Sequence, residues 1–197
     1  MRDAGIGRVL VASLHQGIAD ILPTRLGFYE NWLSAAGLRD GTIGLAPFYA
    51  VLSFLRHEGE AYRTITARAG EYAAEWTVQS MSPVSRGLIA SAPRWLRGRL
   101  VLGLAKRLAR GTFKDSRTAS TLRRGTANVE IRSSIFCTVR EPVTTPLCGF
   151  YASAFVRLML LFQLEAQADV IACRGTGESI CIVRVVLNPH AADPGAA

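Results

Sequence analysis

Residues 168–187, ADVIACRGTGESICIVRVVL, decide the fold class. Two runs rich in Val and Ile flank the polar segment RGTGES, and such runs around a glycine-containing turn predict a β-hairpin. Gly175 and Gly177 would supply the backbone conformations that the turn requires. The segment lacks the Gly-Lys-Ser/Thr of a phosphate loop and the GxGxxG of a dinucleotide site, and a strand rather than a helix follows it. The hairpin therefore predicts an antiparallel sheet.

The segments before the hairpin have mostly helical patterns. Apolar residues recur at spacings of three and four, and proline or glycine marks the ends. The expected helices cover residues 6–22, 28–36, 47–57, 62–78 and 94–113; a half-buried strand at 128–141 and a helix at 147–166, apolar on most sides, follow. This order predicts an α+β fold with N-terminal helices packed on an antiparallel sheet.

The chain is long enough for one domain with a single core. We expect residues 1–60 to form an N-terminal helical segment of this domain, residues 61–187 its core and residues 188–197 a disordered tail. Arg157 interrupts the longest apolar stretch, so no membrane span of about 18 residues is predicted. The early apolar run contains charges that exclude a signal peptide. We therefore expect a cytoplasmic protein whose cysteines are reduced.

The protein is strongly basic, with a net charge of +8, and all its basic residues except Lys106 and Lys114 are arginines. Eleven basic residues and one acid lie between positions 86 and 124. The helix expected at 94–113 would carry leucines on one arc and basic residues on the other. This pattern is compatible with an anionic ligand, with peripheral membrane contact through residues 94–110, or with a solvated face. Nucleic acid is not expected, because the helix lacks interleaved aromatics and any groove-reading motif.

Three cysteines could meet in the predicted fold: Cys148 at the head of the buried helix, and Cys173 and Cys181 on either side of the hairpin turn. A closed zinc site needs four ligands, so Cys137 or Asp169 would have to supply the fourth. The alternative is that all these cysteines are small core residues.

The C-terminal third resembles the 4-vinyl-reductase domain of bacteriochlorophyll biosynthesis. The matching stretches are PLCGFYASAF at 146–155 and the hairpin with Cys173, Gly177 and Cys181. Further matches lie upstream, in AGEY at 69–72, Ala-Pro at 92–93, GTF at 111–113 and VEIR at 129–132. The resemblance covers residues 60–187.

This resemblance implies a TRAPP-subunit-like α+β fold with a pocket for a hydrophobic small molecule. In photosynthesis the ligand would be a chlorophyllide-type tetrapyrrole, and the protein would assist reduction of its vinyl group or pass it to other pathway enzymes. The residues expected to bind the ligand are Tyr72, Trp76, Tyr151, Phe155, Arg99 and Arg107. The resemblance also implies zinc on Cys148, Cys173 and Cys181, with Val170 where related regulators carry a glutamate.

Two other functions fit the same residues. The chain could be the vinyl reductase itself, but it would need an external reductant because no nicotinamide or flavin fingerprint is evident. It could instead be a non-enzymatic sensor or interaction module for another small aromatic or hydrophobic ligand. A homodimer is a further expectation.

Overall fold

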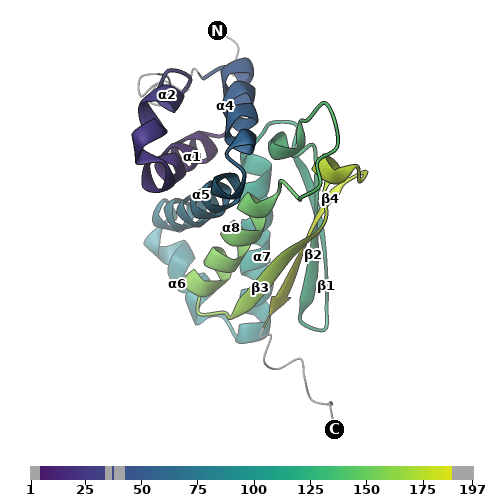
Figure 1. Cartoon of the computed structure of the whole chain (residues 1–197). Coiled ribbons are helices and arrows are strands. Elements are labelled where there is room, and N and C mark those ends of the chain that lie inside the picture. The colour runs from purple at the N-terminus through teal and green to yellow at the C-terminus, as the bar shows by residue number, and fades with distance from the viewer. Residues whose placement is uncertain (1–4, 34–36, 38–42, 188–197) are drawn as a thin grey trace.

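A four-stranded antiparallel sheet forms one side of the molecule, and helices cover one of its faces (Figure 1). The computed structural model describes residues 5–33, 37 and 43–187. The strands are β1 (Arg117–Arg123), β2 (Thr126–Arg132), β3 (Ala166–Ala172) and β4 (Cys181–Leu187), and their order is β1-β2-β4-β3. Every neighbouring pair is antiparallel. The expected α+β fold in a single domain is confirmed.

The helices form layers on the inner face of the sheet. They are α1 (Arg8–Ile21), α2 (Leu26–Glu30), α4 (Leu45–His57), α5 (Glu60–Gln79), α6 (Pro83–Ser91), α7 (Arg94–Gly111) and α8 (Gly149–Leu161), with short 3-10 turns η1 (Pro23–Arg25), η2 (Ile135–Cys137) and η3 (Arg174–Thr176). Helix α8 contacts β3 and β4, and α7 contacts β1. Helix α5 packs on α8, and α1 packs on α5. The core therefore extends from the sheet through three successive helix layers.

Two glycines allow these helices to approach closely. A Cβ at Gly70 of α5 would lie 2.2 Å from the carbonyl oxygen of Phe150 in α8. A Cβ at Gly17 of α1 would lie 2.8 Å from the carbonyl oxygen of Ile65 in α5. No side chain fits at either position without moving a backbone, so both contacts depend on glycine.

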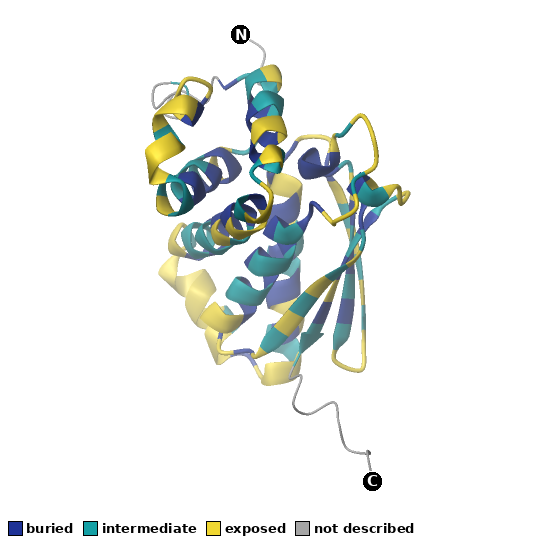
Figure 2. Cartoon of the chain, in the orientation of Figure 1, coloured by how far each residue is buried: buried dark blue, intermediate teal, exposed yellow. Residues whose placement is uncertain are grey.

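The two faces of the sheet differ in exposure, because successive strand residues point to opposite sides. On β2, Ala127, Val129 and Ile131 are buried against the helices, and on β4 Cys181, Val183 and Val185 are buried. The intervening positions are partly or fully exposed (Figure 2). Strands β3 and β4 pair antiparallel around the RGTGES segment, so the predicted hairpin is confirmed.

The structure differs from the expected elements in several places. The strand predicted at 128–141 ends at Arg132, because Ser133 turns the chain with a φ of 56° and η2 follows. Strand β1 and helix α6 were not predicted. The helix expected at 28–36 ends as α2 at Glu30, and residues 34–36 and the tail at 188–197 lie outside the described residues.

The helix expected at 94–113 forms as α7, but its buried stripe is shifted. Gly98, Val101, Ala105 and Leu108 face the core, whereas Leu100 is 40% exposed. Among the described residues, none of the helices combines the length and apolar content of a membrane span.

Candidate metal centre and ligand groove

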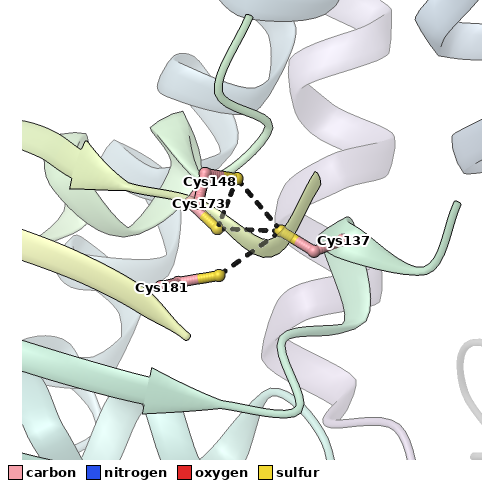
Figure 3. Close-up of side chains that lie close together, drawn as sticks. All are labelled: Cys137, Cys148, Cys173 and Cys181. Carbon is pink, nitrogen blue, oxygen red and sulfur yellow. Dashed lines mark hydrogen bonds between the residues drawn. The ribbon is translucent and has the colours of Figure 1, made fainter. Parts of the chain in front are cut away.

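The four cysteines of the chain meet at one point (Figure 3). Cys137 ends η2, Cys148 directly precedes α8, Cys173 follows β3 and Cys181 begins β4. All four are buried. The turn at Ser133 directs the chain away from the sheet, and this turn brings Cys137 to the other three.

The sulfur atoms have the spacing of a tetrahedral thiolate site. The Sγ atom of Cys137 lies 3.1 Å from that of Cys148, 3.4 Å from that of Cys173 and 3.5 Å from that of Cys181. The Sγ atoms of Cys148 and Cys173 are 3.8 Å apart, and all four lie within 4.8 Å of one another. Zinc–sulfur bonds of about 2.3 Å in a tetrahedron place the sulfurs about 3.8 Å apart. The separations all exceed the roughly 2.05 Å of a disulfide bond, and the four thiols are free.

Polar groups of the surrounding backbone point at two of the sulfurs. The backbone N–H of Leu147 donates to Cys173 Sγ and that of Arg174 to Cys181 Sγ, both at 3.4 Å. Hydrogen bonds to a thiolate favour its charged form. The hairpin turn makes this possible, because Gly177 adopts a φ of 98° and a Cβ at Gly175 would come within 2.8 Å of the Leu147 side chain.

The thiols differ in acidity because they hydrogen-bond to one another. Hydrogen bonds from Cys137 and then Cys148 lower the pKa of Cys173. The corresponding interaction with Cys137 raises the pKa of Cys148. A cation within the cluster would favour the thiolate form of all four, because metal binding displaces thiol protons.

Cys137, and not Asp169, lies beside the other three cysteines. Asp169 is exposed on the outer face of the sheet, where its register partner is Arg184, so it does not face the cluster. Val170 packs against the core. The strand predicted at 128–141 would have placed Cys137 within the sheet, whereas in the structure it ends the turn η2.

A groove with a cavity volume of about 470 Å³ lies between the start of α1, α5, α6 and α7. Its apolar lining is Val9, Leu10, Ala73, Met81, Leu104, Leu108 and Phe150, and its polar lining is Thr77, Ser80, Ser82, Ser85 and Thr112. Arg8 and Arg107, which are exposed, line it as well, together with Gly7 and Gly111. No carboxylate occurs among the described residues that line the groove.

Aromatic residues connect the floor of the groove to the cysteines. The hydroxyls of Thr112 and Tyr151 are 3.1 Å apart, and both are buried. The Phe136 ring stacks on Phe150 at 5.0 Å and meets Tyr151 edge-on at 5.6 Å. Phe136 precedes Cys137, and Phe150 follows Cys148 by two positions. Groove and cysteine cluster thus share one packed aromatic block.

The six residues expected to bind a ligand do not lie together in the structure. Arg107 lines the groove and Tyr151 lies beneath it. Tyr72 and Trp76 stack on each other at 5.5 Å on α5, and the Tyr72 hydroxyl donates to Asp20. Phe155 is fully buried, and Arg99 lies at a different cavity. The remaining groove residues come from four separate segments, and no motif in the sequence marks them.

Comparisons with known proteins support the fold but no sequence family. No family model matches the chain, and no curated protein matches it. The crystal structure of an H-NOX protein from S. oneidensis in the Fe(II)NO state matches with a TM-score of 0.54 and 10% identity, over 93% of this chain and 99% of that one. The NMR structure of an H-NOX domain from Shewanella oneidensis in the Fe(II)CO state matches with a TM-score of 0.55 and 11% identity, over the same shares. The class that these data define is an α+β domain with an H-NOX-like fold.

The resemblance to the 4-vinyl-reductase domain was wrong. Its motifs match no family model, and the structural neighbours are H-NOX domains. The implied role in reducing or passing on a bacteriochlorophyll precursor in photosynthesis is therefore wrong as well. Short matches such as PLCGFYASAF follow from a buried helix behind a cysteine, a pattern that packing alone can produce.

The residues of the groove do not fit a haem, the group that iron(II) with NO or CO implies for the neighbours. A haem iron is held by a proximal His, a Cys thiolate, a Tyr, or a Met that is paired with a His. Of the described lining residues none is His, Cys or Tyr, and Met81 is the one thioether. His15 is hydrogen-bonded to Glu30 at 3.0 Å, His57 is exposed and His190 lies outside the described residues. The four thiols surround one another rather than the groove.

Proposed function

We propose that this chain is a non-enzymatic ligand-sensing module in which four cysteines hold a structural zinc ion and the groove takes a small apolar ligand with an acidic group. The observation that carries the proposal is the cluster of four buried Sγ atoms within 4.8 Å of one another. Support for a sensing role comes from the H-NOX-like fold and from the aromatic block between cluster and groove.

Zinc is the metal that this ligand set favours. Thiolates are soft ligands that select zinc, copper(I) or iron–sulfur clusters, and tetrahedral four-sulfur sites belong to zinc or iron. Four protein ligands leave no open position for substrate, so the site would be structural rather than catalytic. When bound, zinc would supply a fixed cross-link between η2, α8 and the β3–β4 hairpin. Cys137, Cys148, Cys173 and Cys181 would hold it.

The groove indicates the chemistry of its ligand. Seven apolar side chains line it, while Arg8 and Arg107 stand at its exposed side without a carboxylate among the described lining residues. Arginine binds carboxylates through paired N–H donors, so the ligand would have an apolar body and a carboxylate. In this proposal Tyr151 supports the floor through Thr112, whereas Tyr72, Trp76, Phe155 and Arg99 act outside the groove. A homodimer stays a prediction.

Metal analysis tests the zinc centre. Protein purified without chelator from zinc-supplemented cells is expected to contain one zinc per chain, and Cys137→Ser is expected to lose most of it because three thiolates remain. Asp169→Asn is the control and should keep its zinc. Less than about a tenth of an equivalent in the wild type would leave the cysteines as core residues.

Calorimetry with decanoate tests the groove, with 1-decanol as a neutral control of equal chain length. Decanoate is expected to bind, and Arg107→Gln should weaken it about 10-fold through the loss of one charge-assisted contact. The control Arg123→Gln removes an equal charge from the β1 strand and should leave affinity unchanged. Equal affinity for decanol and decanoate would contradict the role of the arginines, and no binding of either would contradict the groove.

A further inference from the structure

One end of the molecule exposes apolar side chains from three helices. We define the α6 end as residues 83–99, 122–125 and 160–165. Val84 is 71% exposed, Leu88 66% and Trp95 68%. Leu160 and Leu161, at the end of α8, are also exposed. Helix α6 has no buried residue and is drawn almost wholly as exposed in Figure 2.

Contacts hold these segments together. The Arg97 guanidinium donates to the carbonyl of Phe162 at 3.4 Å, so the start of α7 adjoins the end of α8. It also donates to the carbonyl of Ala92 at 3.0 Å, just after α6. The exposed apolar side chains therefore belong to one continuous end of the fold.

The same end is strongly basic. Its segments contain six arginines and one acid, Glu165. Arg94, Arg99 and Arg124 line a second cavity of about 370 Å³, and no carboxylate occurs among the described residues that line it. Its remaining lining is Trp95, Leu122, Gly125, Leu164 and Leu187. The Arg99 guanidinium lies over the Trp95 ring, 5.9 Å from its centre, so cationic and apolar groups are adjacent.

The rest of the basic helix does not offer such a surface. Val101, Leu102, Ala105 and Leu108 are buried in the protein core, so the apolar arc of residues 94–110 cannot enter a membrane. Exposed apolar groups and arginines do coincide where α6 and the first turns of α7 meet.

We propose that the α6 end docks on the surface of a bilayer that contains anionic phospholipid. Val84, Leu88 and Trp95 enter the interfacial region, and Arg99 and Arg124 bind phosphate headgroups. Basic residues beside exposed aliphatic and Trp side chains fit this interface, where apolar burial and charge attraction act together. Nucleic acid would use the arginines but would leave Val84 and Leu88 exposed to water.

Vesicle flotation tests the proposal with the full chain. Binding is expected to phosphatidylcholine vesicles that contain phosphatidylglycerol, not to phosphatidylcholine alone, and should weaken as salt is raised. The double variant Arg99→Gln with Arg124→Gln should bind roughly 30-fold more weakly, because it removes two basic residues that attract the anionic lipid. Its matched control is Arg117→Gln with Arg132→Gln, which removes the same charge from the opposite end of the β1–β2 ladder. This control should retain most of its affinity.

The apolar contribution needs its own pair of variants. Leu88→Ser with Trp95→Ser is expected to abolish flotation, whereas Phe28→Ser, an exposed aromatic on α2, should not. All these residues are exposed, so circular dichroism should show unchanged folding. The proposal is overturned by absent binding to the anionic vesicles or by equal losses in both arginine pairs. It is also overturned if a short RNA duplex binds more tightly than the vesicles and the Leu88/Trp95 variant keeps that binding.

Discussion

Gly70→Ala should separate the two helices at the centre of the fold. The added Cβ would lie 2.2 Å from the Phe150 carbonyl oxygen and 3.0 Å from the Ala154 nitrogen. Both atoms belong to the backbone of α8, so no side-chain rotation relieves the overlap. Ordinary contact begins about 1 Å further out, and helices forced apart by 0.5–1 Å lose roughly a quarter to a half of the dispersion energy between them.

The expected cost follows from two opposing effects. Overpacking of a filled core typically costs about 1–3 kcal/mol. Alanine regains up to about 1 kcal/mol over glycine in a helix, and the overlap with backbone places the packing cost at its upper end. We expect a net loss of about 2 kcal/mol in the free energy of unfolding and a fall in Tm of roughly 4–8 °C for a chain of this length.

Thermal and urea unfolding followed by circular dichroism measure this effect. The matched control is Gly103→Ala in the middle of α7, where a Cβ meets nothing within 4 Å. It should stabilise the protein by about 0.5–1 kcal/mol, because it gains helix propensity without overlap. A Gly70→Ala variant as stable as Gly103→Ala would refute the close packing of α5 on α8.

Two further predictions concern buried and charged hydrogen bonds. Tyr151→Phe removes the hydroxyl contact with Thr112, while Thr112 keeps its hydrogen bond to the Ala109 carbonyl. The free energy of unfolding should therefore fall by about 0.5–1.5 kcal/mol. An unchanged midpoint of urea unfolding would show that this contact contributes nothing to stability. Hydrogen bonds from the Tyr72 hydroxyl, Gln16 and Arg68 hold the pKa of Asp20 below its ordinary value of 3.8. These hydrogen bonds therefore stabilise the folded protein above pH 3.8, and their contribution is lost as the pH falls through the lower pKa of the folded state. Asp20→Asn should therefore be less stable near neutral pH by under about 1 kcal/mol, given the exposure of the site, and the difference should vanish in acid; a difference that persists in acid would contradict this account.

The sequence predicted the elements whose local pattern matches their burial. The hairpin is recognisable from two apolar runs around a glycine turn, and α1 and α5 show apolar stripes because they pack on each other. Helix α8 is apolar on most sides because it contacts α5, α7 and the sheet. Strand β1 escaped prediction because its inward residues include Thr118 and Ser120, which give no apolar alternation. Helix α6 was not predicted because it has no buried residue and therefore no stripe of apolar residues.

The candidate site was predictable in part for a similar reason. Cys148, Cys173 and Cys181 flank elements that the pattern identifies, so their approach could be expected. Cys137 depends on the positive φ of Ser133, a conformation that few residues other than glycine adopt and that no local pattern predicts. The groove is formed by segments far apart in the chain, and its assembly depends on helix packing angles that spacing alone does not determine.

The turn at Ser133 has a consequence for how the chain resists proteolysis. Cys137 and Cys148 then lie at the two ends of a mostly exposed loop. A hydrogen bond of 2.7 Å from the backbone N–H of Val143 to the carbonyl oxygen of Gly175 connects this loop to the hairpin. A metal bound by the cysteines would close this loop and also a larger loop of 44 positions between Cys137 and Cys181. Closing these loops would lower the conformational entropy of the unfolded chain. Loss of the ion would free the loop at both ends, and a protease would then cut the chain between residues 138 and 146 before the helical layers unfold.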